Sequence, residues 1–390
     1  MQFDIRDPEF RANPYPLFNL LRENAPVFYW EEWGIWFLTR YEDCNDLLRD
    51  NRLGRGEITG YPESQQALWE MMSKWMLTQD PPDHTRLRGL VHKAFTPRIV
   101  EMMRGEIQTI TDGLLDKVQA DGRMDIIADL AYPLPVTVIA RMFDVPEKDY
   151  ALFHGWSNAL ARSLDYTDDE RVYLNASKAA EEFTAYLQEL VAGRRDNLGQ
   201  DLLSALIEAK EAGDSLTELE LFATCTLLLT AGHETTINLI GNGTLALLRH
   251  PEQMARLQEN PGLMKTAVEE LLRYDSPVQA TGRVVYADVE VGGYTLTPRH
   301  QVNFMLGAAN RDPARFENPN KLDLSRQPNP HLAFGSGIHY CLGAPLARLE
   351  GQIAFATLLR RMPNLCLETD SPKYRDNFTL RGLESLPVSF

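Results

Sequence analysis

A glycine-rich segment that ends in a single cysteine constrains this chain more than any other stretch. Residues 334–345 read FGSGIHYCLGAP, so one thiol, Cys341, lies between a glycine loop and an apolar segment that starts near Leu342. Glycine lets backbone N–H groups approach the sulfur, because no Cβ blocks them. The positive end of a helix that begins at Leu342 favours thiolate over thiol. The segment therefore predicts a cysteine held as an anion at a helix start.

The surrounding sequence limits what such a thiolate does. No second Cys or His stands at chelating spacing from Cys341, whereas a closed zinc site needs four ligands. One anionic sulfur suits an axial bond to a haem iron, where it favours O–O cleavage. The alternative is a small buried hydrophobe, the usual role of a lone intracellular Cys. The pattern Phe-Gly-x-Gly-x-His-x-Cys-x-Gly favours the haem interpretation.

This pattern resembles the haem-binding loop of the cytochrome P-450 superfamily, the haem-thiolate monooxygenases. Further matching segments follow in the family's order over essentially the whole chain. The resemblance implies haem b (iron protoporphyrin IX) with the Cys341 thiolate as axial metal ligand. It also implies a fold that is mainly α with a minor β part, a helical prism around a buried haem with small β-sheets. No linker or repeat divides the chain, so we expect a single domain over residues 1–390.

The resemblance assigns further residues to haem binding. His84 and Arg88 lie four residues apart, so one helix face carries both. Cations with hydrogen-bond donors are natural partners for the two haem propionates. Alone, such a pair is usually a solvated face. By resemblance, the cofactor-binding residues are His84, Arg88, Arg283, Phe334, His339 and Gly343.

A second motif lies in the helix expected over residues 217–249. Its segment 229–236 reads LTAGHETT. A helix-interior Gly costs roughly 1 kcal/mol relative to Ala, which a chain accepts where something approaches closely or the helix opens. The segment resembles the family's (Ala/Gly)-Gly-x-(Asp/Glu)-Thr motif, which implies Thr235 as the oxygen-activating alcohol and Glu234 as the acid of a proton relay. Helical rotation favours Thr235 over its neighbour Thr236. The alternative is a helix kink with a solvated carboxylate.

A third motif is Glu270-Leu-Leu-Arg273 on a predicted helix. A Glu and an Arg three apart share a helix face, but as a surface pair they contribute only tenths of a kcal/mol. By resemblance this is the family's buried Glu-x-x-Arg pair, with Arg326 as a third, structural partner. Leu322 stands where the family usually has an aromatic residue, which weakens the assignment of Arg326 slightly.

Composition excludes several classes of protein. The 390 residues carry a formal net charge of −16, so a general nucleic-acid binder is excluded, because phosphate contacts need a basic surface. The four Cys are irregularly spaced and predict no disulfide framework. The first eight residues carry no apolar stretch, and the apolar region 219–248 is interrupted by charged and polar residues. We therefore expect no membrane anchor, a cytoplasmic location and a bacterial type of enzyme.

Local patterns predict the elements. A hairpin is expected over 27–30 and 35–38, with its turn at Gly34. Strand pairs are expected between Val278 and Phe304, and a short β segment at the end. Thr96-Pro97 predicts a helix start, continuing toward Val118. Further helices are expected at 123–142, 147–162, 168–194, 200–210, 217–249, 261–274 and 342–361.

Apolar stretches predict the type of substrate. By resemblance, residues 69–77 form a mobile lid, and the walls come from 227–231, 278–280 and 378–380. Ordinary packing is the alternative for the Trp and Met residues of the lid. Adaptable Met and broad Trp side chains suit an apolar small molecule, so we expect a fatty acyl, terpenoid or polyketide substrate. The chain looks most similar to macrolide- and fatty-acyl-oxidising members.

Electrons are expected from outside, since neither a flavin- or nucleotide-binding segment nor a Cys cluster for iron–sulfur is present. A ferredoxin with its ferredoxin reductase is the expected donor, docking on His92, Lys93, Arg98 and Arg348. The expected reaction inserts one oxygen atom of O2 into the substrate. Alternatives are a peroxygenase, a carbon–carbon cleaving oxidase, and a non-catalytic haem carrier or gas sensor.

Overall fold

The computed structural model of the protein describes residue 4, residues 7–211 and residues 216–390. Most of the N-terminal residues considered for a signal, 1–3 and 5–6, lie outside this part. Contacts group the chain into two compact units. The first comprises Met1–Gly54, Glu106–Pro133 and Thr235–Phe390, and the second comprises Arg55–Gly105 and Leu134–Glu234. The single domain expected from the sequence stays a prediction.

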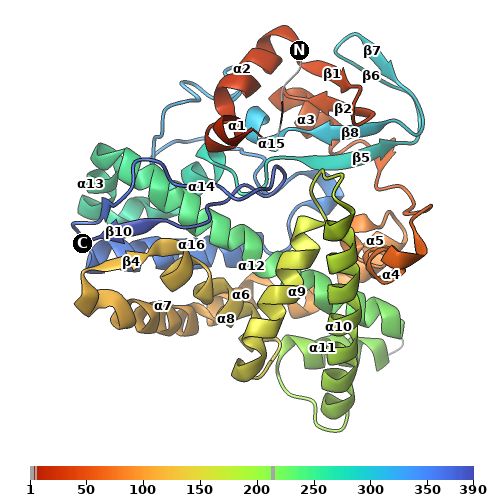
Figure 1. Ribbon diagram of the computed structural model, residues 1–390, viewed down its shortest axis with the longest axis horizontal. Coiled ribbons are helices and arrows are strands. Elements are labelled where there is room, and N and C mark those ends of the chain that lie inside the picture. Colours follow the sequence, from red (N-terminus) through yellow and green to blue (C-terminus); the bar gives the residue numbers. More distant parts are fainter. Residues whose placement is uncertain (1–3, 5–6, 212–215) are drawn as a thin grey trace. The chain divides into compact units, whose positions relative to one another are not determined.

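A small mixed sheet belongs to the first unit (Figure 1). Its described strands follow the spatial order β1 (Val27–Trp30), β2 (Ile35–Leu38), β8 (Gln301–Phe304), β5 (Thr281–Val285) and β3 (Leu53–Gly54). The expected hairpin is confirmed: β1 and β2 are antiparallel, and Gly34 in the turn has φ +66°. Strand β2 runs parallel to β8, whereas β8 with β5 and β5 with β3 are antiparallel. The sheet places Arg283 of β5 opposite Val302 of β8.

Beside the sheet, the first unit contains a hydrophobic core that is formed mainly by helices. They are α12 (Glu218–Arg249, whose C-terminal half belongs here), α13 (Pro251–Glu259), α14 (Met264–Tyr274) and α16 (Ala344–Arg361). Their apolar faces share buried residues such as Leu247, Val268, Leu271 and Phe355. Because α14 and α16 bury these faces against each other, the position of α16, the helix that follows Cys341, is fixed by the core.

The second unit is helical in its described part. It contains α4 (Gln66–Met72), α5 (Asp83–Ala94), α6 (Pro97–Met102), α8 (Pro133–Met142), α9 (Tyr150–Arg162), α10 (Glu170–Arg194) and α11 (Leu202–Glu211). Helices α9 and α10 lie side by side (Figure 1), with Phe153 and Trp156 packed on Phe183. Trp69 of α4 contacts Tyr173 of α10, with ring centroids 5.8 Å apart. The segment expected to form a lid, residues 69–77, is thus packed against α10 through the side chain of Trp69.

The remaining α-helices and strands of the described part are mostly short, apart from the 15-residue α7. They are α1 (Pro8–Ala12), α2 (Tyr15–Asn24), α3 (Tyr41–Leu47), α7 (Arg104–Val118), α15 (Leu306–Ala309), β4 (Arg123–Asp125), β6 (Val289–Val291), β7 (Tyr294–Leu296), β9 (Cys366–Leu367) and β10 (Pro387–Ser389). Helices dominate and the sheets are small, as the sequence predicts. No helix in the described ranges combines the length and apolar character that crossing a bilayer requires.

Two predicted helices are wrong in extent. The helix expected at 123–142 begins as strand β4, continues as a π-helix over Ile126–Ala131, and becomes α-helical only at Pro133. The reason is tertiary: Met124 pairs with Val388 of β10, and the Asp125 carboxylate accepts hydrogen bonds from the N–H groups of the next helix. The helix begun at Pro97 also ends at Met102, and α7 follows separately from Arg104.

Candidate active site

The loop that presents Cys341 is held by its own backbone. The Cys341 N–H donates to the Phe334 carbonyl over 3.0 Å, which closes the glycine-rich segment. Gly335 and Gly337 have φ of +70° and +71°, a region that other residues rarely adopt. A Cβ at Gly337 would also overlap the Leu48 carbonyl oxygen. The glycines therefore serve the shape of the loop.

The thiol of Cys341 stands at a helix start, as the sequence predicts, although the helix begins two residues later than expected. Helix α16 begins at Ala344, with Gly343 as its N-cap and Pro345 in its first turn. A Cβ at Gly343 would lie 3.8 Å from the Cys341 sulfur, so the backbone runs close to the thiol. Cys341 is exposed, whereas Ala344 is fully buried. The helix N-terminus favours the thiolate at this position.

The donor set around Cys341 fits a haem. Among the described residues, no group of three or more His, Cys, Asp or Glu is arranged to hold a metal ion. The described part of the protein therefore offers one sulfur and not a closed set of ligands. This donor set suits a haem iron, because the porphyrin ring supplies the equatorial ligands and the protein needs to supply only one axial ligand.

Helix α12 is continuous from Glu218 to Arg249. Gly232 has a packing reason: a Cβ there would approach the Ile139 side chain of α8 to 3.1 Å. Ala231 is exposed and Thr235, one turn later, is half-buried, although most of the surrounding helix is buried. Thr236 is only 2% exposed and is oriented toward the protein interior. Ala231 and Thr235 thus share an accessible stripe on α12.

Glu234 is buried, with 7% of its surface exposed. Its neighbour His233 is also buried, and its Nδ1 donates to the Leu229 carbonyl over 2.7 Å, which satisfies this ring nitrogen within the helix. The motif therefore consists of a buried acid followed directly by an accessible alcohol.

A buried acid that sequence reasoning missed lies near this motif. Glu350 of α16 has no solvent exposure and lies near the Thr236 hydroxyl, and neither of its carboxylate oxygens has a hydrogen-bond partner among the described residues. Burial raises the pKa of Glu350 to about 8, and the nearby Thr236 hydroxyl lowers it only partly. The signal in the sequence was a lone carboxylate between apolar residues of the helix that follows Cys341.

The Glu270–Arg273–Arg326 triad is confirmed. Arg273 donates to both Glu270 oxygens at 2.8 Å, with both side chains fully buried. Arg326 Nε lies 3.0 and 3.1 Å from the same oxygens, and the Asp323 N–H donates to Oε1 over 3.0 Å. Arg273 also donates to carbonyls of the coil before the cysteine loop. The triad therefore fixes this coil despite the departure at Leu322, which is itself buried in the core.

The expected propionate-binding residues belong to both units. His84 and Arg88 lie on α5 in the second unit, where His84 is only 2% exposed. Arg283, on β5 in the first unit, is 6% exposed and donates to the Gly282 carbonyl over 2.7 Å. His339 is half-buried in the short turn before Cys341. Basic side chains are seldom buried in proteins, so the burial of His84 and Arg283 argues against an ordinary solvated surface position for them.

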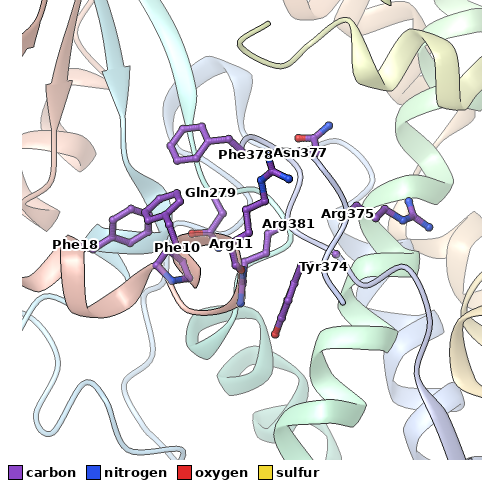
Figure 2. Close-up of a pocket in the computed structure, with 11 residues that line it drawn as sticks. Phe10, Arg11, Phe18, Gln279, Tyr374, Arg375, Asn377, Phe378 and Arg381 are labelled. Carbon is purple, nitrogen blue, oxygen red and sulfur yellow. The ribbon is translucent and has the colours of Figure 1, made fainter. Parts of the chain in front are cut away.

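A pocket adjoins one of the segments expected to contact substrate. Phe378 and Gln279 line it together with Phe10 and Arg11 of α1 and with Arg381 (Figure 2). The Val278 and Leu380 backbones form a bridge beside it. Two of its cations are paired with carboxylates: Arg381 pairs with Asp275 at 2.7 Å and Arg11 pairs with Asp376 at 2.6 Å. Phe10 stacks on Phe378, so aromatic and charged groups both line the pocket.

The cations expected to dock an electron donor have different surroundings. His92 and Lys93 are exposed at the end of α5, and Arg98 is exposed on α6. Arg348 of α16 instead forms two hydrogen bonds with Glu269 of α14, at 2.7 and 2.9 Å.

Comparisons with known proteins identify the family. The family model for cytochrome P450 matches residues 35–388. The chain belongs to the cytochrome P450 family. A solved structure of P450BioI, in complex with hexadec-9Z-enoic acid ligated acyl carrier protein, is 44% identical and superposes with a TM-score of 0.93, covering 98% of this chain and 99% of that one.

Two curated relatives extend this likeness. The polyketide biosynthesis cytochrome P450 PksS of Bacillus subtilis is 42% identical over 100% of this chain and 98% of its own. Cytochrome P450 monooxygenase PikC of Streptomyces venezuelae is 42% identical, covering 97% of this chain and 92% of its own. The predicted family and fold are therefore confirmed, and this cytochrome P450 is a monooxygenase. Family membership implies a haem cofactor.

Proposed function

We propose that this cytochrome P450 binds haem b through the Cys341 thiolate as axial ligand. The single accessible thiol at the N-terminus of α16 carries this proposal, because helix and loop both favour its anionic form. His84, Arg88, Arg283 and His339 would bind the propionates, and Phe334 and Gly343 would also contribute to the cofactor site. The burial of His84 and Arg283 supports this assignment.

Bound haem supplies the activation of O2, and the residues of α12 supply protons. Thr235 is accessible and follows a buried acid, Glu234. In the proposed relay, the Thr235 hydroxyl would orient water and pass protons into the site where O2 is activated, and Glu234 would replace these protons. Thr236 is not assigned this role, because its side chain is only 2% exposed and is buried in the interior.

We propose that the substrate is an apolar small molecule of the fatty acyl, polyketide or terpenoid class, which receives one oxygen atom. The predicted wall segments are largely apolar. Support also comes from relatives: the P450BioI structure contains a fatty acyl group on an acyl carrier protein, and PksS belongs to polyketide biosynthesis by name.

A ferredoxin and its reductase are the proposed electron donors. The exposed cations His92, Lys93 and Arg98 offer contacts to an acidic partner. We further propose a cytoplasmic location, which fits the four cysteines, none of which forms a disulfide.

The spectrum of the reduced, carbon monoxide-bound protein tests the axial ligand. The parent protein is expected to show the long-wavelength band of thiolate-ligated haem, and Cys341→Ala is expected to lose it. Cys366→Ala is the matched control, because Cys366 is also exposed and free. A Cys341→Ala protein that binds haem and oxidises substrates like the parent would refute the proposal.

The proton relay predicts a difference between two adjacent threonines. Thr235→Ala is expected to consume electrons but release peroxide, with at least about a tenfold loss of product per electron, since general acid–base groups contribute roughly 10²–10⁴-fold. Thr236→Ala is expected to keep its coupling. The measurement is product formed against NADH consumed with a surrogate ferredoxin system. Full coupling in Thr235→Ala would exclude the relay.

A further inference from the structure

Arg348 connects helix α16 with two other segments of the first unit. Its guanidinium donates to the Glu269 carboxylate through Nε (2.7 Å to Oε1) and Nη2 (2.9 Å to Oε2). Glu269 lies on α14, one residue before Glu270 of the triad. It also accepts a hydrogen bond from His331 Nε2 over 3.1 Å. We call Glu269, His331 and Arg348 the Glu269 cluster.

The same guanidinium touches both ends of the loop that presents Cys341. Nη1 of Arg348 donates to the Tyr340 hydroxyl over 3.2 Å, and its central carbon lies 4.6 Å from the centre of the Phe334 ring. The Phe334 carbonyl accepts the Cys341 N–H, and Tyr340 directly precedes Cys341. Arg348 therefore contacts the first and the last residue of the segment 334–340 that leads into the thiol.

Within the Glu269 cluster, the charges of Arg348 and Glu269 cancel. Burial alone raises the pKa of Glu269, but hydrogen bonds from His331 and Arg348 lower it to about 2, so the carboxylate is ionised at physiological pH. The Ala333 N–H donates to His331 Nδ1 over 3.2 Å, so in the neutral ring the proton lies on Nε2. The side chains of Arg348 and Glu269 are 29% and 27% exposed. Charges in such surroundings are screened less than charges in water.

We infer that Glu269 is a positioning residue for the haem-ligating sulfur: it clamps and neutralises Arg348, which holds the Cys341 loop and sets the charge that the sulfur experiences. This inference rests on the proposed axial role of Cys341. It assigns Arg348 to the support of the loop, where the sequence suggested a docking contact.

The two charges of the pair make opposite contributions to haem reduction. Without the Glu269 carboxylate, the positive charge of Arg348 is uncompensated, and it favours the reduced state, which carries one more electron. Without the guanidinium, the negative charge of Glu269 remains and disfavours reduction. Removing both restores neutrality. A purely structural role would instead move both single variants in the same direction, because each weakens the same pair of hydrogen bonds.

The experiment is a redox titration of the haem-loaded protein carrying Glu269→Gln, Arg348→Gln, or both. We expect the equilibrium constant for one-electron reduction to rise about threefold in Glu269→Gln and to fall about threefold in Arg348→Gln, about 30 mV in each direction. The double variant is expected near the parent value. Arg361→Gln is the matched control: it removes a cation from the same helix about 20 Å along its axis, where Arg361 pairs with Asp116, and no shift is expected.

The thiolate band of the reduced, carbon monoxide-bound parent separates two kinds of failure. If the parent lacks this band, the axial role of Cys341 falls, and the inference falls with it. If the parent shows the band but both single variants shift in one direction, or neither shifts, only the inference is overturned. Should Glu269→Gln fail to bind haem, Arg348→Lys serves instead, because it keeps the charge and loses the paired donors. A parent-like potential in Arg348→Lys supports the inference, and a shift as large as that of Arg348→Gln overturns it.

Discussion

Glu350 is a carboxylic acid inside the apolar face of α16. Its pKa is raised from 4.5 to about 8 by burial, so the group stays protonated at neutral pH in the folded protein. In the unfolded chain the same group ionises near pH 4.5. The folded state therefore binds more protons than the unfolded state between these values, and the contribution of Glu350 to stability falls as pH rises through this window.

Replacing this acid should change the pH dependence of stability. Glu350→Gln is expected to lose the part of the decline between about pH 5 and pH 8 that Glu350 causes, which amounts to a few kcal/mol by order of magnitude. The measurement is the free energy of unfolding in urea at pH 6 and pH 8. Glu259→Gln, at an exposed position of α13, is the control and should follow the parent. An equally steep decline in Glu350→Gln would contradict the raised pKa.

Single residues differ in how far the sequence predicts them. Cys341 and Thr235 stand in patterns whose chemistry is local, a thiol at a helix start and an alcohol after an acid, so both were predicted. Glu269 and Glu350 were missed because their importance comes from partners about 80 and 114 positions away, Arg348 and Thr236.

At the level of elements, the glycines of two helices have opposite effects on stability. Gly243 of α12 faces Phe355 of α16, and a Cβ there would come within 2.5 Å of the ring. Gly113 of α7 is exposed, and a Cβ there would meet nothing within 4 Å. Gly243 therefore allows α12 and α16 to pack closely, whereas Gly113 lowers the stability of α7 through its conformational entropy and gains no packing contact.

This difference predicts two opposite changes of stability. Gly113→Ala should raise the free energy of unfolding by about 0.5–1 kcal/mol, since Ala restricts the unfolded chain and fits the helix. Gly243→Ala should lower it by about 1–3 kcal/mol, since the added methyl overpacks against Phe355. Urea denaturation of both variants beside the parent provides the test. A stabilised Gly243→Ala would mean that α12 and α16 are less closely packed than observed.

The extents of elements were predicted less well than their existence. The segment 123–131 has a helical pattern, yet its first residues pair with the C-terminal strand β10. Its partner lies more than 250 positions away, and no local propensity carries that information. The hairpin of β1 and β2 was predicted in full, because its turn and both strands lie within twelve residues.

At the scale of the whole molecule, substrate binding should stabilise the fold through mass action. A ligand that binds only the folded state at 100 times its dissociation constant adds about 2.7 kcal/mol to the free energy of unfolding. For the proposed substrate class, a long-chain fatty acid should raise the unfolding midpoint of the haem-loaded protein. A short-chain acid of equal charge, at the same concentration, should not.

The comparison of the two acids identifies what the molecule recognises. Equal stabilisation by both would show that the carboxylate and not the apolar chain is bound, and would contradict the proposed substrate class. The formal net charge of −16 adds a reason to expect weak binding of the short acid, since an acidic protein repels anions over several ångströms at low salt.

The sequence by itself determined the family, the mainly helical fold, the cysteine of the glycine-rich loop, and the order of the motifs along the chain. These depend on residue types at short, fixed spacings, where the chain's own geometry decides which side chains share a face. Only the tertiary structure decided that β10 recruits residues 123–125, that Glu350 is buried against Thr236, and that Glu269 holds Arg348 against the cysteine loop. Each is a contact between distant segments, and its energy depends on burial and charge compensation that arise only when the chain is folded.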